Sequence, residues 1–100
     1  MEVIFEYDNV KSSNRLETKS LQKLNKLSTK YPFIVRGSVF FKTERTQNPE
    51  TGRICAIKLS VPGPLLFAEH NCADFESALL EVIHELEAQL AKKKGKMIAH

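Results

Sequence analysis

An apolar stripe in the last third of the chain constrains the fold most, because such a stripe must pack against another apolar surface. Residues 74–94 place apolar side chains three and four positions apart, as one face of an α-helix requires. Asp74 is a suitable N-cap, Ser77 stands where a full capping box has Glu or Gln, and Gly95 is expected to end the helix. The stripe consists of Phe75, Ala78, Leu79, Val82, Ile83, Leu86 and Leu90.

Four segments rich in β-branched and aromatic residues predict strands, and another amphipathic segment predicts a second helix. This helix is expected at residues 13–30, with Ser13 as its N-cap and Pro32 beyond its end. Turn residues at 46–52 predict a hairpin loop, and the Pro-Gly-Pro sequence at 62–64 separates the last two strands. The strands are expected at residues 2–7, 33–44, 53–61 and 65–70.

The predicted order is β-α-β-β-β-α, which defines an α+β fold. With two helices and one mostly antiparallel four-stranded sheet, both helices are expected on the same face of the sheet. The 100 residues have the length of one domain, so we predict a single unit over residues 1–100. Phe40 and Phe41 must point to opposite faces of their strand, which places one of them on the open face.

Positive charge gathers on one side of the predicted first helix. At about 100° per residue, five cations fall within an arc of about 80° beside the apolar face. The one acid nearby in this segment, Glu17, points away from them. Cations repeated at this spacing destabilise an isolated helix, so they indicate either a polyanion-binding surface or a solvated lysine-rich face. This basic stripe consists of Arg15, Lys19, Lys23, Lys26 and Lys30.

A second group of cations lies near the end of the chain. Acids in the middle of the C-terminal helix give way to four lysines in five positions, an order of charges that the helix dipole favours. Four lysines exceed what the dipole requires and suit a polyphosphate backbone. If the helices lie side by side, the two groups form one cationic surface that contacts phosphates rather than bases. This basic tail consists of Lys92, Lys93, Lys94 and Lys96.

No catalytic or metal-binding pattern accompanies these cations. Cys55 and Cys72 lie in apolar contexts and are expected to be reduced, partly buried thiols. His70 and Cys72 supply only two metal ligands, without a second pair at zinc spacing. Glu69, His70 and Asp74 fall near one corner of the predicted fold, yet no nucleophile pattern joins them. We therefore predict no enzyme, no metal, no cofactor and no small-molecule substrate.

Membrane and export signals are also missing from the sequence pattern. The longest apolar run, residues 65–68, is far shorter than the roughly 20 residues of a membrane helix. Residues 1–8 carry acids where a secretory signal carries bases. We therefore expect a cytoplasmic protein without a membrane partner.

The C-terminal helix resembles the last helix of the ribosome hibernation-promoting factors, also called the sigma-54 modulation or ribosome-associated inhibitor family. The resemblance extends over most of the chain, and the family fold, β-α-β-β-β-α, is similar to a double-stranded-RNA-binding domain. Departures are Phe75, one place early for the family's Tyr, Leu79-Leu80 in place of Ile-Asp, and a longer loop at 46–53. The matching positions are Asp74, Ala78, Leu86, Gln89, Leu90, Lys92, Lys94 and Lys96.

The resemblance implies binding to small-subunit rRNA in the tRNA and mRNA channel, with inhibition of translation in idle or stressed cells and in stationary phase. It assigns rRNA binding to the basic stripe and the basic tail, with Lys42 and Arg45 as secondary candidates. The chain stops at His100, without the dimerisation domain of long members, so it resembles a short form. A second hibernation factor is then a candidate partner. Promotion of ribosome dimers and inactivation of single ribosomes both stay open.

The competing interpretation is a protein–protein interaction module that uses the open face of the sheet or an exposed strand edge. Salt dependence separates the two. Binding through phosphates weakens steeply as salt rises, whereas binding through an apolar interface does not.

Overall fold

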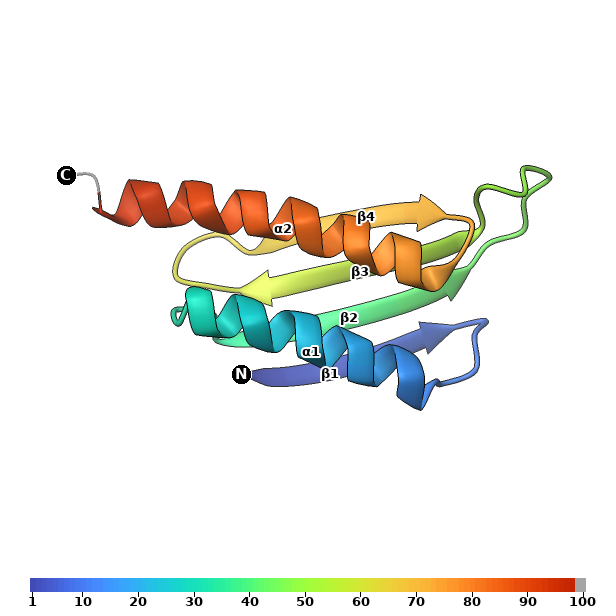
Figure 1. Ribbon diagram of the computed structural model, residues 1–100, viewed down its shortest axis with the longest axis horizontal. Coiled ribbons are helices and arrows are strands. Elements are labelled where there is room, and N and C mark those ends of the chain that lie inside the picture. The colour runs from blue at the N-terminus through green and yellow to red at the C-terminus, as the bar shows by residue number, and fades with distance from the viewer. Residues whose placement is uncertain (99–100) are drawn as a thin grey trace.

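Four strands form one sheet, and both helices lie across the same face of it (Figure 1). The computed structural model describes residues 1–98, so His100 and the end of the predicted 1–100 unit lie outside the described residues. The predicted element order and the placement of both helices on one face are confirmed. The elements are β1 (Glu2–Asp8), α1 (Asn14–Lys30), β2 (Arg36–Thr43), β3 (Arg53–Ser60), β4 (Leu66–Cys72) and α2 (Phe75–Ile98).

The strands follow one another across the sheet in the order β1-β2-β3-β4. β1 pairs with β2 in parallel because α1 carries the chain back across the sheet, whereas the two later pairs are antiparallel hairpins. Alternation along each strand then separates a helix-covered face from an open face. Phe41 is fully buried on the covered face, while Phe40 is half-buried on the open face.

The core lies between the covered face of the sheet and the two helices. Leu24 of α1 and Leu86 and Leu90 of α2 are fully buried there. Burial of each such side chain stabilises the fold by about 1.5–3 kcal/mol. The ring of Phe41 lies 5.8 Å from that of Tyr7 in a stacked arrangement and 5.5 Å from that of Phe75 edge to face. These ring contacts join β1, β2 and the start of α2.

Both predicted helix caps are present. The backbone N–H of Leu16 donates to Ser13 Oγ over 3.2 Å at the start of α1. At the start of α2 the backbone N–H of Ser77 donates to Asp74 Oδ1 over 2.8 Å, and the Ser77 hydroxyl lies 3.1 Å from Asp74 Oδ2. Ser77 therefore bonds the capping carboxylate itself, in place of the Glu or Gln of a capping box.

Most predicted boundaries differ from the structure by one or two residues, and two differ by three or more. The strand expected from residue 33 begins at Arg36, because the N–H of Ile34 first donates to the carbonyl of Tyr31 in a turn. The C-terminal helix does not end at Gly95 but continues to Ile98. A glycine ends a helix by adopting positive φ, and among the described glycines only Gly52 and Gly63 do so. None of the described helices combines the length and apolar composition of a membrane span.

Candidate nucleic-acid interface

α1 carries the basic stripe along its exposed side. Its opposite side packs on the sheet through Leu16, Leu24 and Leu27, and the buried Ser20 donates its hydroxyl to the Leu16 carbonyl over 2.7 Å. This hydrogen bond satisfies the Ser20 hydroxyl, a polar group that is buried in the core. Since the apolar side is fixed, the cations of the basic stripe emerge beside α2, which runs in the same direction across the sheet (Figure 1).

Acidic residues of α2 reach across to the basic stripe. Glu76 accepts from Arg15 at 2.6 Å and from Lys19 at 2.8 Å, and Glu87 accepts from Lys30 at 2.8 Å. The sequence analysis considered only the acid of the same helix, Glu17, and did not predict these acidic partners on α2. Lys19 and Lys30 are each separated by 57 positions from their acidic partner, so only the packing of the two helices brings them together.

These contacts change the acidity of the paired groups. The hydrogen bond from Lys19 lowers the pKa of Glu76, and the charge of Arg15 acts in the same direction. The hydrogen bond with Lys30 likewise lowers the pKa of Glu87 and raises the pKa of Lys30 itself. All of these groups are open to solvent, where ion pairs are weak and screened by salt. A more highly charged anion can therefore compete for the cations.

The middle of the basic stripe differs from its ends. Lys26 is exposed and Lys23 is half-exposed. Among residues 1–97, no carboxylate lies within ion-pair distance of either ammonium group. These two lysines are the members of the stripe that stand free to meet an external anion.

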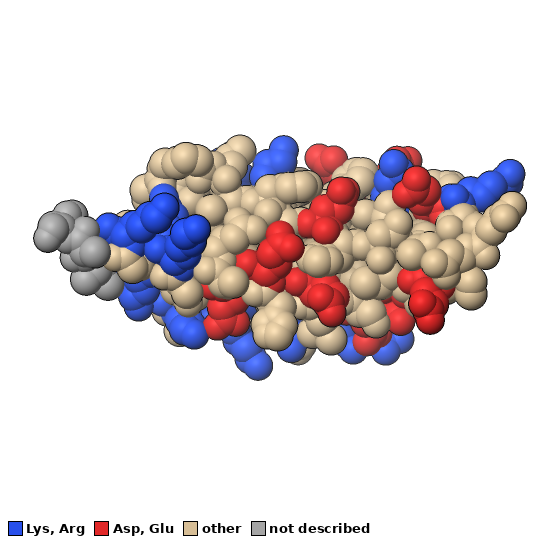
Figure 2. Space-filling model, turned by 90° about the horizontal axis from the view of Figure 1, so that it is seen from above, with Lys and Arg blue, Asp and Glu red and all other residues tan. Residues whose placement is uncertain are grey.

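The basic tail lies on the last turns of α2. Lys92, Lys94 and Lys96 are exposed, and the half-buried Lys93 lies against the turn at Gly63. No ion pair joins these four lysines to an acid in the described part of the chain. Figure 2 shows a group of cations at one end of the molecule and acids along its middle, with further cations along the lower edge and at the opposite end.

Tyr31 connects the basic stripe to the basic tail. The Nζ atoms of Lys30 and Lys94 lie 5.6 and 5.7 Å from the centre of its ring. The ring is only 2% exposed, and cation–π attraction favours both placements. At this end of the molecule the structure therefore brings the two predicted groups together. Helical spacing alone places Tyr31 on the apolar side of α1 and does not predict this role, because Lys94 reaches the ring only through the packing of the two helices.

The secondary candidates do not join this surface. Lys42 lies on the open face of the sheet, beside Asp8 of β1 and Ile54 of β3. Arg45 lies in the loop between β2 and β3, at the opposite end of the molecule from the basic tail (Figure 1). Both remain predictions of RNA contact, but Lys42 lies on the face opposite the helices and Arg45 lies far from the basic tail.

The remaining reactive side chains do not converge. His70 lies 3.0 Å from Glu85, whereas Glu69 points to the open face of the sheet. Both cysteines are free, and burial raises the pKa of Cys55 to about 12 and also raises that of Cys72. Within the described residues, no group of three potential metal ligands comes together.

Fold and surface together define a class of protein, a small α+β domain whose two parallel helices present cations suited to a polyanion. The sequence places it more narrowly, because residues 3–98 match the family model described as sigma 54 modulation protein / S30EA ribosomal protein. The chain belongs to this family, which consists of ribosome-binding factors and is not known as an enzyme family. No curated protein matches the chain.

Two solved structures have the same fold. A ribosomal subunit interface protein from Coxiella burnetii superposes with a TM-score of 0.82 at 22% identity, over 95% of this chain and 99% of that one. The N-terminal domain of Protein Y from Thermus thermophilus gives a TM-score of 0.76 at 19% identity, over 92% of this chain and 98% of that one. The layout of strands and helices is thus shared over almost the full length of all three chains.

Proposed function

We propose that this protein binds small-subunit rRNA in the channel used by tRNA and mRNA, and thereby inhibits translation in idle or stressed cells, including stationary phase. One observation carries the proposal: the basic tail, which has no acidic partner among the described residues, meets the basic stripe over Tyr31. Clustered, unpaired lysines suit the phosphates of an RNA backbone. Family membership and the likeness to a ribosomal subunit interface protein support the ribosome as the partner.

In the proposed mechanism the protein inhibits translation by occupying the tRNA and mRNA channel, and it catalyses no reaction. Phosphate contacts fix position but carry no sequence information directly, so site choice must come from the shape of the channel. The cations stand on helices fixed to the sheet by a buried core, which keeps their spacing constant. Inhibition should then need one protein per ribosome, in the cytoplasm, without a cofactor. Inhibition that saturates far below one protein per ribosome would point to an enzyme instead.

Sedimentation with small ribosomal subunits over a salt series tests the proposal. Each neutralised phosphate contributes about −0.7 to −0.9 to the slope of log affinity against log salt. If about five cations engage, the slope should be roughly −4, and tRNA should compete with the protein. Affinity that hardly changes with salt would contradict a phosphate-binding surface.

A second candidate function uses the open face of the sheet. Ile4 and Phe67 are 43% and 50% exposed there, beside a shallow hollow that Phe40 also lines. Exposed apolar side chains grouped on one face favour a protein partner, for which a second hibernation factor is our candidate. Replacing Phe67 with Ser should abolish such binding and leave the salt-dependent binding to ribosomal subunits unchanged.

A further inference from the structure

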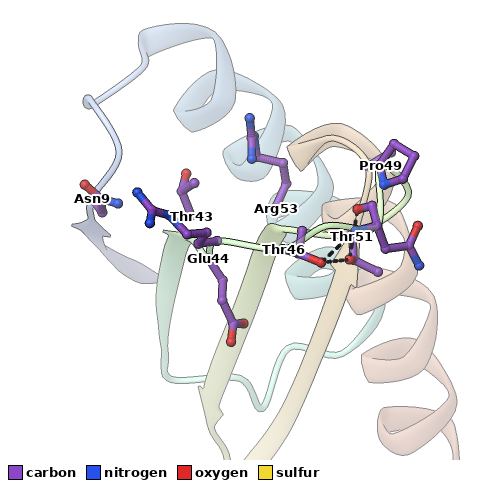
Figure 3. A pocket seen from close by; sticks show the side chains of 10 residues that line it. Asn9, Thr43, Glu44, Thr46, Pro49, Thr51 and Arg53 are labelled. Atoms are coloured by element: carbon purple, nitrogen blue, oxygen red, sulfur yellow. Dashed lines mark hydrogen bonds between the residues drawn. The ribbon is translucent and has the colours of Figure 1, made fainter.

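A pocket beside the β2–β3 loop, drawn in Figure 3, lies at the end of the molecule opposite the basic tail (Figure 1). Its volume is about 430 Å³. Three separate segments form its walls: the turn after β1 with Asn9, the loop between β2 and β3, and Ala73 just before α2. The pocket is thus built by the tertiary fold and not by one flexible loop.

The loop wall of this pocket is held in place by hydrogen bonds. The N–H of Glu44 donates to the carbonyl of Gly52 over 2.9 Å, and the N–H of Gly52 donates to Asn71 Oδ1 over 2.6 Å. The hydroxyls of Thr46 and Thr51 lie 3.1 Å apart (Figure 3). Gly52 has a φ of +110°, and a Cβ there would approach Thr46 and Glu44 to about 3 Å. A wall ordered in advance lowers the entropic cost of binding a ligand.

Two arginines line this pocket, and they differ from the other two arginines of the sequence. Arg15 and Arg36 form ion pairs with Glu76 and Glu2, whereas Arg45 and Arg53 have no carboxylate within 4 Å in the described structure. Among the described residues, the one hydrogen bond of the Arg53 side chain is long, 3.5 Å from Nη1 to the Gly52 carbonyl.

The acid that also lines the pocket does not neutralise these arginines. Glu44 and Arg53 leave opposite faces of the sheet, since Arg53 faces Thr43 across the β2–β3 pair. Figure 3 shows the Glu44 carboxylate and the Arg53 guanidinium pointing in opposite directions. Unpaired guanidinium groups beside a preformed wall are suited to the planar, two-point contacts that phosphate oxygens accept.

We propose that this pocket is a phosphate subsite, in which Arg45 and Arg53 hold one phosphate group and the Asn9 side chain borders it. The proposal rests on the proposed function and deepens it: the phosphate belongs to the RNA that the helices contact. The molecule is 49 Å long, so the basic tail and this subsite attach the protein at two distant points. Two-point attachment fixes orientation along an RNA, which a single cationic end does not.

The test compares the variant Arg45→Ala/Arg53→Ala with Arg36→Ala, which removes an exposed arginine on the open face. Affinity for small subunits is measured over a salt series. Loss of one charge-assisted contact should weaken binding roughly tenfold in the double variant. The salt slope should become shallower by about 0.7–0.9, and Arg36→Ala should change neither quantity. An unchanged affinity and slope in the folded double variant would overturn the subsite while leaving ribosome binding intact.

A second measurement does not depend on the ribosome. The Nε–H signals of Arg45 and Arg53 are followed by NMR during titration with inorganic phosphate and with a short RNA. Saturable shifts with RNA, accompanied by shifts in the basic tail, support an RNA phosphate as the ligand. If inorganic phosphate saturates the shifts at a concentration equal to or lower than that of RNA, the ligand of this subsite is free phosphate and not RNA. If neither titrant shifts these signals, the proposal of a phosphate subsite is wrong. If the signals shift but the protein does not bind small subunits, the subsite is supported and only the proposed function is wrong.

Discussion

The basic stripe of α1 and the basic tail of α2 contain five and four cations, yet their surroundings differ. Three members of the stripe have acidic partners on α2, whereas the tail has none in the described structure. A cation that already has a carboxylate must give up that contact to bind a phosphate. The number of cations in a sequence pattern therefore overstates the charge available to a ligand. Neighbouring residues in the folded structure decide which cations are available.

The largest effect is expected from the tail. The variant Lys92→Glu/Lys96→Glu replaces with acids two cations that have no acidic partner in the described structure, and it should weaken small-subunit binding by about 100-fold or more at low salt. Both side chains are exposed, so the circular dichroism spectrum should stay native. Lys58→Glu, which reverses one exposed lysine on the open face, is the control for charge reversal away from the tail and is compared with the single variant Lys92→Glu. If the folded tail variant binds like the unaltered protein, the tail is not part of the interface.

A smaller effect should divide the stripe into two parts. Lys23→Ala/Lys26→Ala removes the unpaired cations and should weaken binding roughly tenfold. Arg15→Ala/Lys19→Ala removes cations that share Glu76 and should weaken it only about two- to threefold. The two variants remove the same charge, so the comparison isolates the effect of pairing. If sedimentation shows the same loss of affinity in both variants, the ion pairs do not reduce the contribution of Arg15 and Lys19 to binding.

The reverse change should strengthen binding slightly. Glu76→Gln releases Arg15 and Lys19 together, so affinity for subunits should rise a few-fold and the salt dependence should become steeper. Fluorescence anisotropy with a labelled RNA measures both quantities. A weaker affinity in this variant would mean that Glu76 instead orients the two cations for RNA.

The smallest effect concerns stability and pH. The pKa of Glu76, Glu87 and Asp74 is lowered in the folded protein, by Lys19, by Lys30 and by the N–H of Ser77 respectively. Carboxylates of this kind contribute stability above their ordinary pKa, and the contribution is lost as pH falls through the folded-state value. Because Asp74 is exposed and Glu76 and Glu87 are half-exposed, the melting temperature should fall only slightly on acidification below about pH 4.5. Glu87→Gln should flatten that dependence, whereas an identical pH profile would contradict the pair with Lys30.

Local signals in the sequence were sufficient for much of the fold. Ser13 and Asp74 mark helix starts because their side chains cap the neighbouring backbone N–H groups. Alternation along β1 placed Val3 and Ile4 on opposite faces because strand geometry has a period of two. The prediction that the helix ends at Gly95 was wrong because a glycine ends a helix only when it adopts positive φ. A glycine permits that conformation but does not require it.

The site was less predictable because its geometry depends on contacts between distant segments. The cations of α1 were found from helical spacing, but Glu76 and Glu87 appear beside them only once the helices pack in parallel. Arg53 was not predicted for the same reason, because it lines the same pocket as Arg45 only when β2 and β3 pair and close the hairpin. Which of these cations contact RNA stays a prediction that the binding measurements decide.

The placement of Tyr31 has an optical consequence. The sequence has two tyrosines and no tryptophan, so tyrosine dominates its near-ultraviolet absorption and emission. Tyr7 donates its hydroxyl to Glu17 over 2.7 Å, whereas Tyr31 lies close to the ammonium groups of Lys30 and Lys94. A phosphate that draws these lysines off the ring changes the electric field at one of only two chromophores. Unlabelled protein should therefore report its own binding to RNA through a shift in tyrosine spectra, and Tyr31→Phe should remove most of that signal.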